Sequence, residues 1–179
     1  MQQVTRTRQT TERGLTLIEL LLIITIIGIL ANVMLPSYFL AKERARYSRA
    51  LLELRQIEDA LHLYTEEYGV YPDDASRNIP PGLEDFLAES DVDNWPDAPW
   101  AGSVYDWDAW DDPDIPGERI YQISIRFCPI GGPLEDCNFP RLAWASGFGV
   151  NSAMYYCVSG ACRPHIAEPV GYPGHCVNC

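Results

Sequence analysis

The sequence predicts an α+β fold, in which a long N-terminal α-helix with an apolar first half packs by its second half on a small antiparallel β-sheet. Three patterns support this fold class. Residues 20–41 are uncharged and mostly apolar, apolar and tyrosine side chains recur at helical spacing over residues 47–68, and residues 120–127 alternate between apolar and polar. The length of 179 residues suits one domain with an added membrane helix.

The apolar first half of the predicted helix is long enough to cross a membrane. The 22 residues from 20 to 41 carry no charge, and at about 1.5 Å per residue they make a helix of roughly 33 Å. The hydrocarbon core of a bilayer is about 30 Å thick, so we expect residues 15–41 to form a transmembrane segment. Pro36 removes one helical hydrogen bond, which predicts a kink or a locally unwound section over residues 32–36.

Glu19 is the one ionisable residue between residues 14 and 35. A carboxylate in a membrane helix is costly unless it has a partner, and no side chain from residue 15 to residue 41 is positive. Two interpretations are open. Glu19 interacts with the positive end of its own helix in the first turn, or it pairs with a cation outside the segment, such as a newly made amino terminus or another chain.

The helix is predicted to continue as an amphipathic element over residues 42–70. One face carries an apolar stripe with spacings of three and four residues. The stripe consists of Tyr47, Ala50, Leu54, Ile57, Leu61, Tyr64 and Tyr68. Either a coiled-coil partner or the protein's own sheet would cover it, and the tyrosines favour the sheet because they suit a half-buried surface. Gly69 ends the helix and Pro72 prevents its resumption.

Residues 71–119 are predicted to be a connecting loop region rich in acids, tryptophan and proline, with a short helix at residues 83–88. Clustered carboxylates suit calcium, which takes roughly six to eight oxygen ligands. The candidate ligands are Asp106, Asp108, Asp111, Asp112 and Asp114. The spacing lacks the glycine and glutamate of an EF-hand, so a solvated acidic loop is the alternative.

Residues 120–179 are predicted to hold the sheet, with strands at 120–127, 142–146 and 154–158. All the cysteines lie in this region: Cys128, Cys137, Cys157, Cys162, Cys176 and Cys179. An even count beyond an exported segment predicts disulfides formed outside the cytoplasm. Cys128 can pair with Cys137 across a loop and Cys157 with Cys162 across a hairpin. A zinc site made of the C-terminal cysteines with His165 and His175 is the alternative.

The charge and the motifs of the chain exclude several functional classes. The formal net charge is −12, which argues against direct binding of nucleic acid phosphates. The sequence contains no glycine-rich phosphate loop, no HExxH and no GxSxG, and its three histidines have no evident nucleophile partner. The sequence therefore predicts a protein without catalytic activity.

The string RGLTLIELLLIITIIGILA at residues 13–31 resembles the class III signal of type IV pilins and of the pseudopilins of type II secretion. The resemblance implies that a prepilin peptidase removes residues 1–14 by cutting after Gly14. It implies that Leu15, where the family usually has phenylalanine or methionine, becomes the methylated N-terminus. Glu19 is then the fifth residue of the mature chain and neutralises the α-amine of a neighbouring subunit. In assembled pilins the section that ends at Pro36 is often melted, and the same is expected here.

This resemblance implies a structural subunit of a type IV pilus-like filament, held in the membrane as a single-pass protein and then assembled outside the cell. Its expected partners are copies of itself, the prepilin peptidase and N-methylase, the pilus or secretion assembly machinery, and the membrane. A type II secretion pseudopilin is the first alternative. A monomeric membrane-anchored extracellular binding module is the second. The sequence establishes no cofactor, and calcium is the candidate that its clustered carboxylates suggest.

Overall fold

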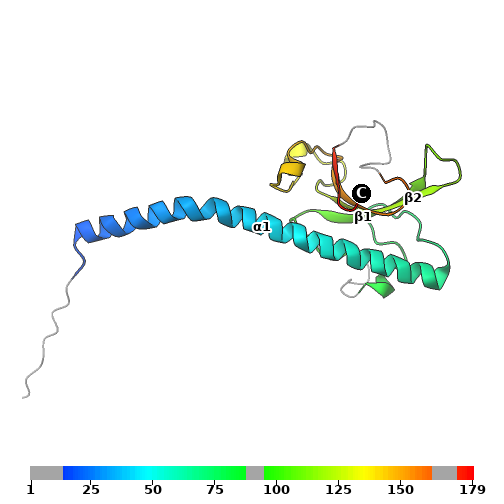
Figure 1. Ribbon diagram of the computed structural model, residues 1–179, viewed down its shortest axis with the longest axis horizontal. Coiled ribbons are helices and arrows are strands. Elements are labelled where there is room, and N and C mark those ends of the chain that lie inside the picture. The colour runs from blue at the N-terminus through cyan, green and yellow to red at the C-terminus, as the bar shows by residue number, and fades with distance from the viewer. Residues whose placement is uncertain (1–13, 88–94, 163–172) are drawn as a thin grey trace, which may run out of the picture. The chain divides into compact units, whose positions relative to one another are not determined.

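The computed structural model describes residues 14–87, 95–162 and 173–179, so most of the predicted leader lies outside the described residues. Figure 1 shows one long helix and a small sheet, which confirms the predicted α+β fold. In chain order the elements are α1 (Leu17–Tyr68), η1 (Glu84–Phe86), β1 (Val104–Asp111), β2 (Arg119–Arg126), η2 (Leu134–Asp136), η3 (Ala143–Ala145), β3 (Ala153–Ser159) and β4 (Gly174–Cys176).

The chain divides into two compact units, Met1–Phe39 and Leu40–Cys179. The described part of the first unit is the apolar section of α1, and it is long and apolar enough to cross a membrane. The helix continues through Pro36 without a break. The unwound section is therefore not present in the single chain, and melting in an assembled filament stays a prediction.

The second unit is a head in which the later part of α1 packs on the sheet. The middle of the predicted stripe is fully enclosed, since Ala50, Leu54 and Leu61 have no exposed surface. Polar contacts flank this apolar contact, and Tyr156 of β3 donates its hydroxyl to Glu58 at 2.7 Å. The stripe thus packs on the protein's own sheet and not on a coiled-coil partner. Tyr68, at the end of the stripe, stays half-exposed.

The sheet has the strand order β1-β2-β3-β4 and is mixed. The first three strands are antiparallel, as predicted, whereas the short β4 pairs in parallel with β3. Trp107 lies opposite Ile123 in the β1/β2 register, and both point into the core against α1. The alternate positions of each strand therefore form a second face that points away from this core.

Three local predictions for the head differ from the structure. The acidic region contains strand β1, whose alternation of aromatic and acidic residues fits the two faces of a sheet. Residues 142–146 are not a strand but contain the 3₁₀ turn η3. Within this turn the ring centroid of Trp144 lies 4.3 Å from that of His175 and 5.5 Å from that of Phe148. The short helix predicted at residues 83–88 is present only as the 3₁₀ turn η1 in its described part.

Candidate functional site

The N-terminal end of α1 holds Glu19 against the backbone of its own first turn. The Glu19 carboxylate accepts hydrogen bonds from the Thr16 backbone N–H at 2.9 Å and from the Thr16 hydroxyl at 2.7 Å, and the Thr16 hydroxyl accepts from the Glu19 N–H at 3.3 Å. This reciprocal arrangement is a capping box, which satisfies donors that the start of a helix leaves free. In the single chain the carboxylate therefore stabilises its own helix start.

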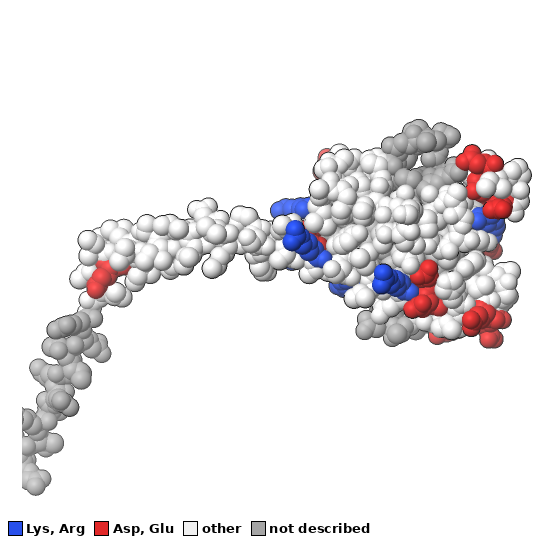
Figure 2. Space-filling model, in the orientation of Figure 1, with Lys and Arg blue, Asp and Glu red and all other residues white. Residues whose placement is uncertain are grey.

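The surface of the first unit is an apolar arm, which we define as residues 15–39. Its large side chains are all exposed, from Leu17 at 77% to Ile23 at 43%. On the face shown in Figure 2 the arm is uncharged except for acidic atoms near its N-terminal end. Gly14 and Leu15 precede the helix and are exposed, so the predicted cleavage point is accessible. Such a surface can enter a bilayer or pack on other arms.

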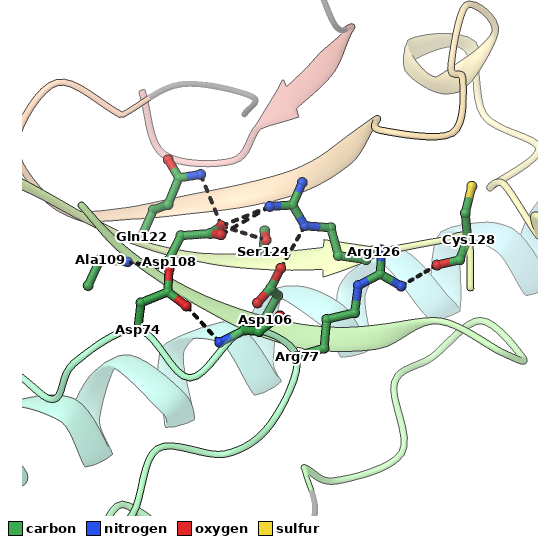
Figure 3. Close-up of polar contacts among 10 residues, drawn as sticks. Asp74, Arg77, Asp106, Asp108, Ala109, Gln122, Ser124, Arg126 and Cys128 are labelled. Atoms are coloured by element: carbon green, nitrogen blue, oxygen red, sulfur yellow. Dashed lines mark hydrogen bonds and ion pairs between the residues drawn. The ribbon is translucent and has the colours of Figure 1, made fainter. Parts of the chain in front are cut away.

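The head contains a buried ion cluster on the sheet face that points away from α1, formed by Arg126, Asp106 and Asp108 (Figure 3). Arg126 Nε donates to Asp106 Oδ2 at 2.9 Å, and Arg126 Nη2 donates to Asp108 Oδ1 at 3.0 Å. Ser124 and Gln122 donate to the other Asp108 oxygen, at 2.8 and 3.3 Å. All three charged side chains are less than a tenth exposed.

The register of β1 and β2 creates this cluster. Asp106 lies opposite Ser124 and Asp108 lies opposite Gln122, which places alternate residues of both strands on the same face. Burial raises the pKa of Asp106 to about 6, the charge of Asp108 acts in the same direction, and Arg126 opposes both. The arginine is therefore what allows two carboxylates to lie side by side in the head.

The five calcium candidates fall into two separate groups. Asp106 and Asp108 are held by Arg126, whereas Asp111, Asp112 and Asp114 lie at and beyond the far end of β1. Successive strand residues rise about 3.3 Å, so the two groups are on the order of 10–15 Å apart and one ion cannot contact them all. At the second group Asp112 accepts the Asp114 N–H at 2.8 Å, and calcium binding there stays a prediction.

The cysteines of the head form three local disulfides. The structure joins Cys128 to Cys137, Cys157 to Cys162 and Cys176 to Cys179. His175, offered above as a zinc ligand, shares a hydrogen bond with Tyr47 at 3.1 Å and stacks on Trp144. His165 lies outside the described residues. His175 thus has a packing role between β4 and α1.

Curated relatives match between about a third and about half of the chain. The type II secretion system core protein G of Aeromonas hydrophila is 30% identical over 102 residues, covering 52% of this chain and 71% of the relative. The chain belongs to the pilin and pseudopilin family. The core protein G of Escherichia coli strain K12 is 29% identical over 97 residues, covering 50% of this chain and 67% of the relative. The type IV major pilin protein PilE of Neisseria gonorrhoeae is 42% identical over 65 residues, covering 36% of this chain and 39% of the relative.

No family model matches this pilin-family chain. No solved structure matches it either. The relatives still confirm the resemblance inferred from residues 13–31, and they include both pilins and pseudopilins.

Sequence reasoning missed two polar positions that organise the head of this pilin-family chain. Arg126 is one of the polar positions of the predicted strand at 120–127, and its two-residue spacing from Ser124 matches the spacing of Asp106 and Asp108. Glu43 is buried where α1 enters the head and accepts the Trp100 indole N–H at 3.0 Å. Nothing in the local sequence could reveal this, because Trp100 is 57 residues away.

Proposed function

We propose that the protein is a structural subunit of a type IV pilus-like filament, stored in the membrane through residues 15–41 before assembly. The observation that carries this proposal is the exposed apolar arm on a head that has its own enclosed core. So large an apolar surface requires lipid or other apolar arms around it. Relatives named as a major pilin and as secretion core proteins support a filament subunit without catalytic activity.

Assembly in this proposal depends on Glu19. Cleavage after Gly14 creates a positive α-amine at Leu15, and Glu19 of one subunit pairs with the α-amine of the next. Both hydrogen bonds from Thr16 go to Glu19 Oε2, and within the described residues no hydrogen bond to Oε1 is recorded. One carboxylate oxygen is therefore free to accept from a neighbour. Pairing of the two charges offsets their desolvation among apolar arms.

Glu19→Ala tests this function against the anchored binding module. We expect the variant to insert in the membrane as the wild type does but to be absent from filaments sheared from the cell surface. Intact mass and N-terminal sequencing of the sheared wild type should show a methylated chain that starts at Leu15. The matched control is Thr16→Ala, which removes the hydroxyl donor and keeps the Glu19 charge, so it should still assemble. A wild-type chain that starts at Met1 and stays in membranes would contradict the proposal.

A pseudopilus of type II secretion is the second candidate, because relatives of the chain include core proteins G of type II secretion systems as well as major pilins. In this case loss of the protein should stop the export of folded enzymes to the medium without removing surface filaments. Enzyme activity in the medium of a deletion strain, set against filament yield, separates the two candidates.

A further inference from the structure

Two disulfides lie side by side where β4 forms the edge of the sheet next to β3. Cys157 of β3 is joined to Cys162, and Cys176 of β4 is joined to Cys179. The sulfur atoms of Cys157 and Cys179 belong to different disulfides but are 3.5 Å apart, and the Cys176 sulfur lies within 4.8 Å of both. We call these four residues the sulfur cluster. Its two disulfides are in direct contact.

The parallel pairing of β4 with β3 creates this contact. Tyr155 lies opposite Cys176, and the Val177 N–H donates to the Tyr155 carbonyl at 2.9 Å. Continued in the same register, the pairing brings Asn178 alongside Cys157. The approach of the two disulfides is therefore a product of the sheet and not of a single loop.

The side chain of Asn178 holds the segment after β4 against β3. Asn178 Oδ1 accepts the Cys157 N–H at 2.8 Å, and Asn178 Nδ2 donates to the Cys157 carbonyl at 2.8 Å. One amide group thus bonds both backbone groups of Cys157. We call this pair of hydrogen bonds the Asn178 clamp. Because Cys179 is the next residue, the clamp holds the Cys179 sulfur beside that of Cys157.

Disulfides that touch in this way exchange partners once one thiolate is present. A thiolate attacks one sulfur of a disulfide, and the other sulfur leaves as a thiolate. An S–S bond is about 2.05 Å long, so the sulfurs of Cys157 and Cys179 need to approach by about 1.5 Å. Cys179 is exposed, so a dissolved dithiol can reach it. A metal ion would require these sulfurs as thiolates, whereas the structure holds each in a disulfide.

We propose that the sulfur cluster is a thiol–disulfide exchange site whose co-substrate is a dithiol, and that the Asn178 clamp positions its reacting sulfur atoms. The dithiol reduces Cys176–Cys179 to two thiols and is itself oxidised to a disulfide. The Cys179 thiolate then attacks the Cys157 sulfur, and a Cys157–Cys179 bond forms as the Cys157–Cys162 bond breaks. Cys162 leaves as a thiolate and takes up the proton that Cys179 lost. Reduction of Cys157–Cys162 first leads to the same product, because Cys157 then attacks Cys179 and releases Cys176.

The exchange changes how the edge of the sheet is held. The two disulfides of the structure join residues that are 5 and 3 positions apart in the sequence. The product joins residues that are 22 positions apart and links the segment after β4 covalently to β3. A dithiol therefore converts two local links into one link across the β3/β4 pair.

One equivalent of dithiothreitol, added to the oxidised full chain in nonionic detergent, tests the exchange. Free thiols are then blocked with N-ethylmaleimide in urea, and the surviving disulfides are mapped by peptide mass spectrometry. We expect a Cys157–Cys179 peptide, with maleimide on Cys162 and Cys176. Reduction at either disulfide of the cluster without this peptide, or reduction confined to Cys128–Cys137, would overturn the proposal. The protein is unassembled, so the result does not depend on filament formation.

Cys162→Ser starts the exchange without a reductant. It leaves Cys157 as a free thiol beside Cys179, so attack forms the Cys157–Cys179 bond and releases Cys176. We expect maleimide on Cys176 as well as on Cys157. Label on Cys157 alone would contradict the exchange.

Cys137→Ser is the matched control for the free thiol. It frees Cys128, which follows the end of β2 and is not part of the sulfur cluster. All of the label should then lie on Cys128. Label that appears on the cluster in this variant as well would show that scrambling is not specific to the cluster and would overturn the proposal.

Asn178→Ala tests the clamp, because it removes both hydrogen bonds and keeps every cysteine. Each bond contributes about 1 kcal/mol, so we expect the Cys157–Cys179 bond to form about 10-fold more slowly after reduction. The rate at which dithiothreitol reduces Cys176–Cys179 should stay that of the wild type, a difference that general destabilisation would not produce. Asn151→Ala, before β3, is the matched control and should leave both rates unchanged. An unchanged exchange rate in Asn178→Ala would overturn the positioning role of the clamp.

Discussion

At the scale of single residues, Arg126 allows two carboxylates to be buried on the sheet face that points away from α1. Two carboxylates lie within 3.0 Å of its guanidinium, and all three groups are buried. A buried ion pair adds little stability compared with apolar packing, but removal of one partner leaves uncompensated charge in the head. Arg126 is therefore a structural requirement of this face.

We predict that Arg126→Met lowers the free energy of unfolding of the head by about 3–5 kcal/mol, because Asp106 and Asp108 lose their shared cation. Urea denaturation followed by tryptophan fluorescence, with the chain in nonionic detergent, measures this change. Arg55→Met is the matched control, since Arg55 is exposed on α1 and its loss should change stability by less than about 0.5 kcal/mol. Equal effects of the two changes would show that the ion cluster is not formed.

The sequence could predict the role of a residue where that role depends on residues close to it in the sequence. Glu19 was found because it is the one acid in an apolar stretch, and Cys157 and Cys162 were placed together because a turn separates them. Asp106 and Asp108 were read as calcium candidates because the arginine that holds them is some 20 residues away. Only the strand register reveals that contact.

At the scale of elements, one face of α1 supplies the core of the head. The periodicity of this face was visible in the sequence, and the structure confirms which side is covered. Leu54 is completely buried, whereas Leu52, two residues earlier, is 61% exposed. These two leucines therefore form a natural pair for comparing buried and exposed positions on the same helix.

We predict that Leu54→Ala lowers the free energy of unfolding of the head by about 2–5 kcal/mol, because it leaves a cavity against the sheet. Leu52→Ala should change it by less than about 0.5 kcal/mol, since the removed atoms already contact solvent. The denaturation midpoints of both variants check this. A similar loss in both would mean that the exposed side of the helix is also covered in the isolated subunit.

Strand β1 shows why the sheet was harder to predict than the helix. Its acids have low strand propensity, so the acidic composition indicated a loop. In the structure Trp107 and Tyr105 face the core. Arg126 of β2 neutralises the acids on the other face. Likewise the short β4 exists only through its parallel pairing with β3, a contact that no local pattern encodes.

At the scale of the whole molecule, the division into two units separates two tasks. The head encloses its own core, whereas every large apolar side chain of the arm is exposed. In the proposed filament, such a subunit would exchange lipid around the arm for other arms without a change in the fold of the head. The sequence predicted this division, because charge is absent from residues 20–41 and amphipathic periodicity begins after them.

The separation predicts that a charge in the arm affects membrane insertion and assembly but not the stability of the head. Ile24→Lys places an ammonium in the apolar segment, at a cost of about 2.5–3.5 kcal/mol at the centre of a membrane helix. We expect its yield in sheared filaments to fall by at least 10-fold, while the urea midpoint of the head stays that of the wild type. Ile24→Val, which keeps the site apolar, should preserve both. A lower midpoint in Ile24→Lys would show that the arm contributes to the fold of the head, and the two tasks would then be coupled.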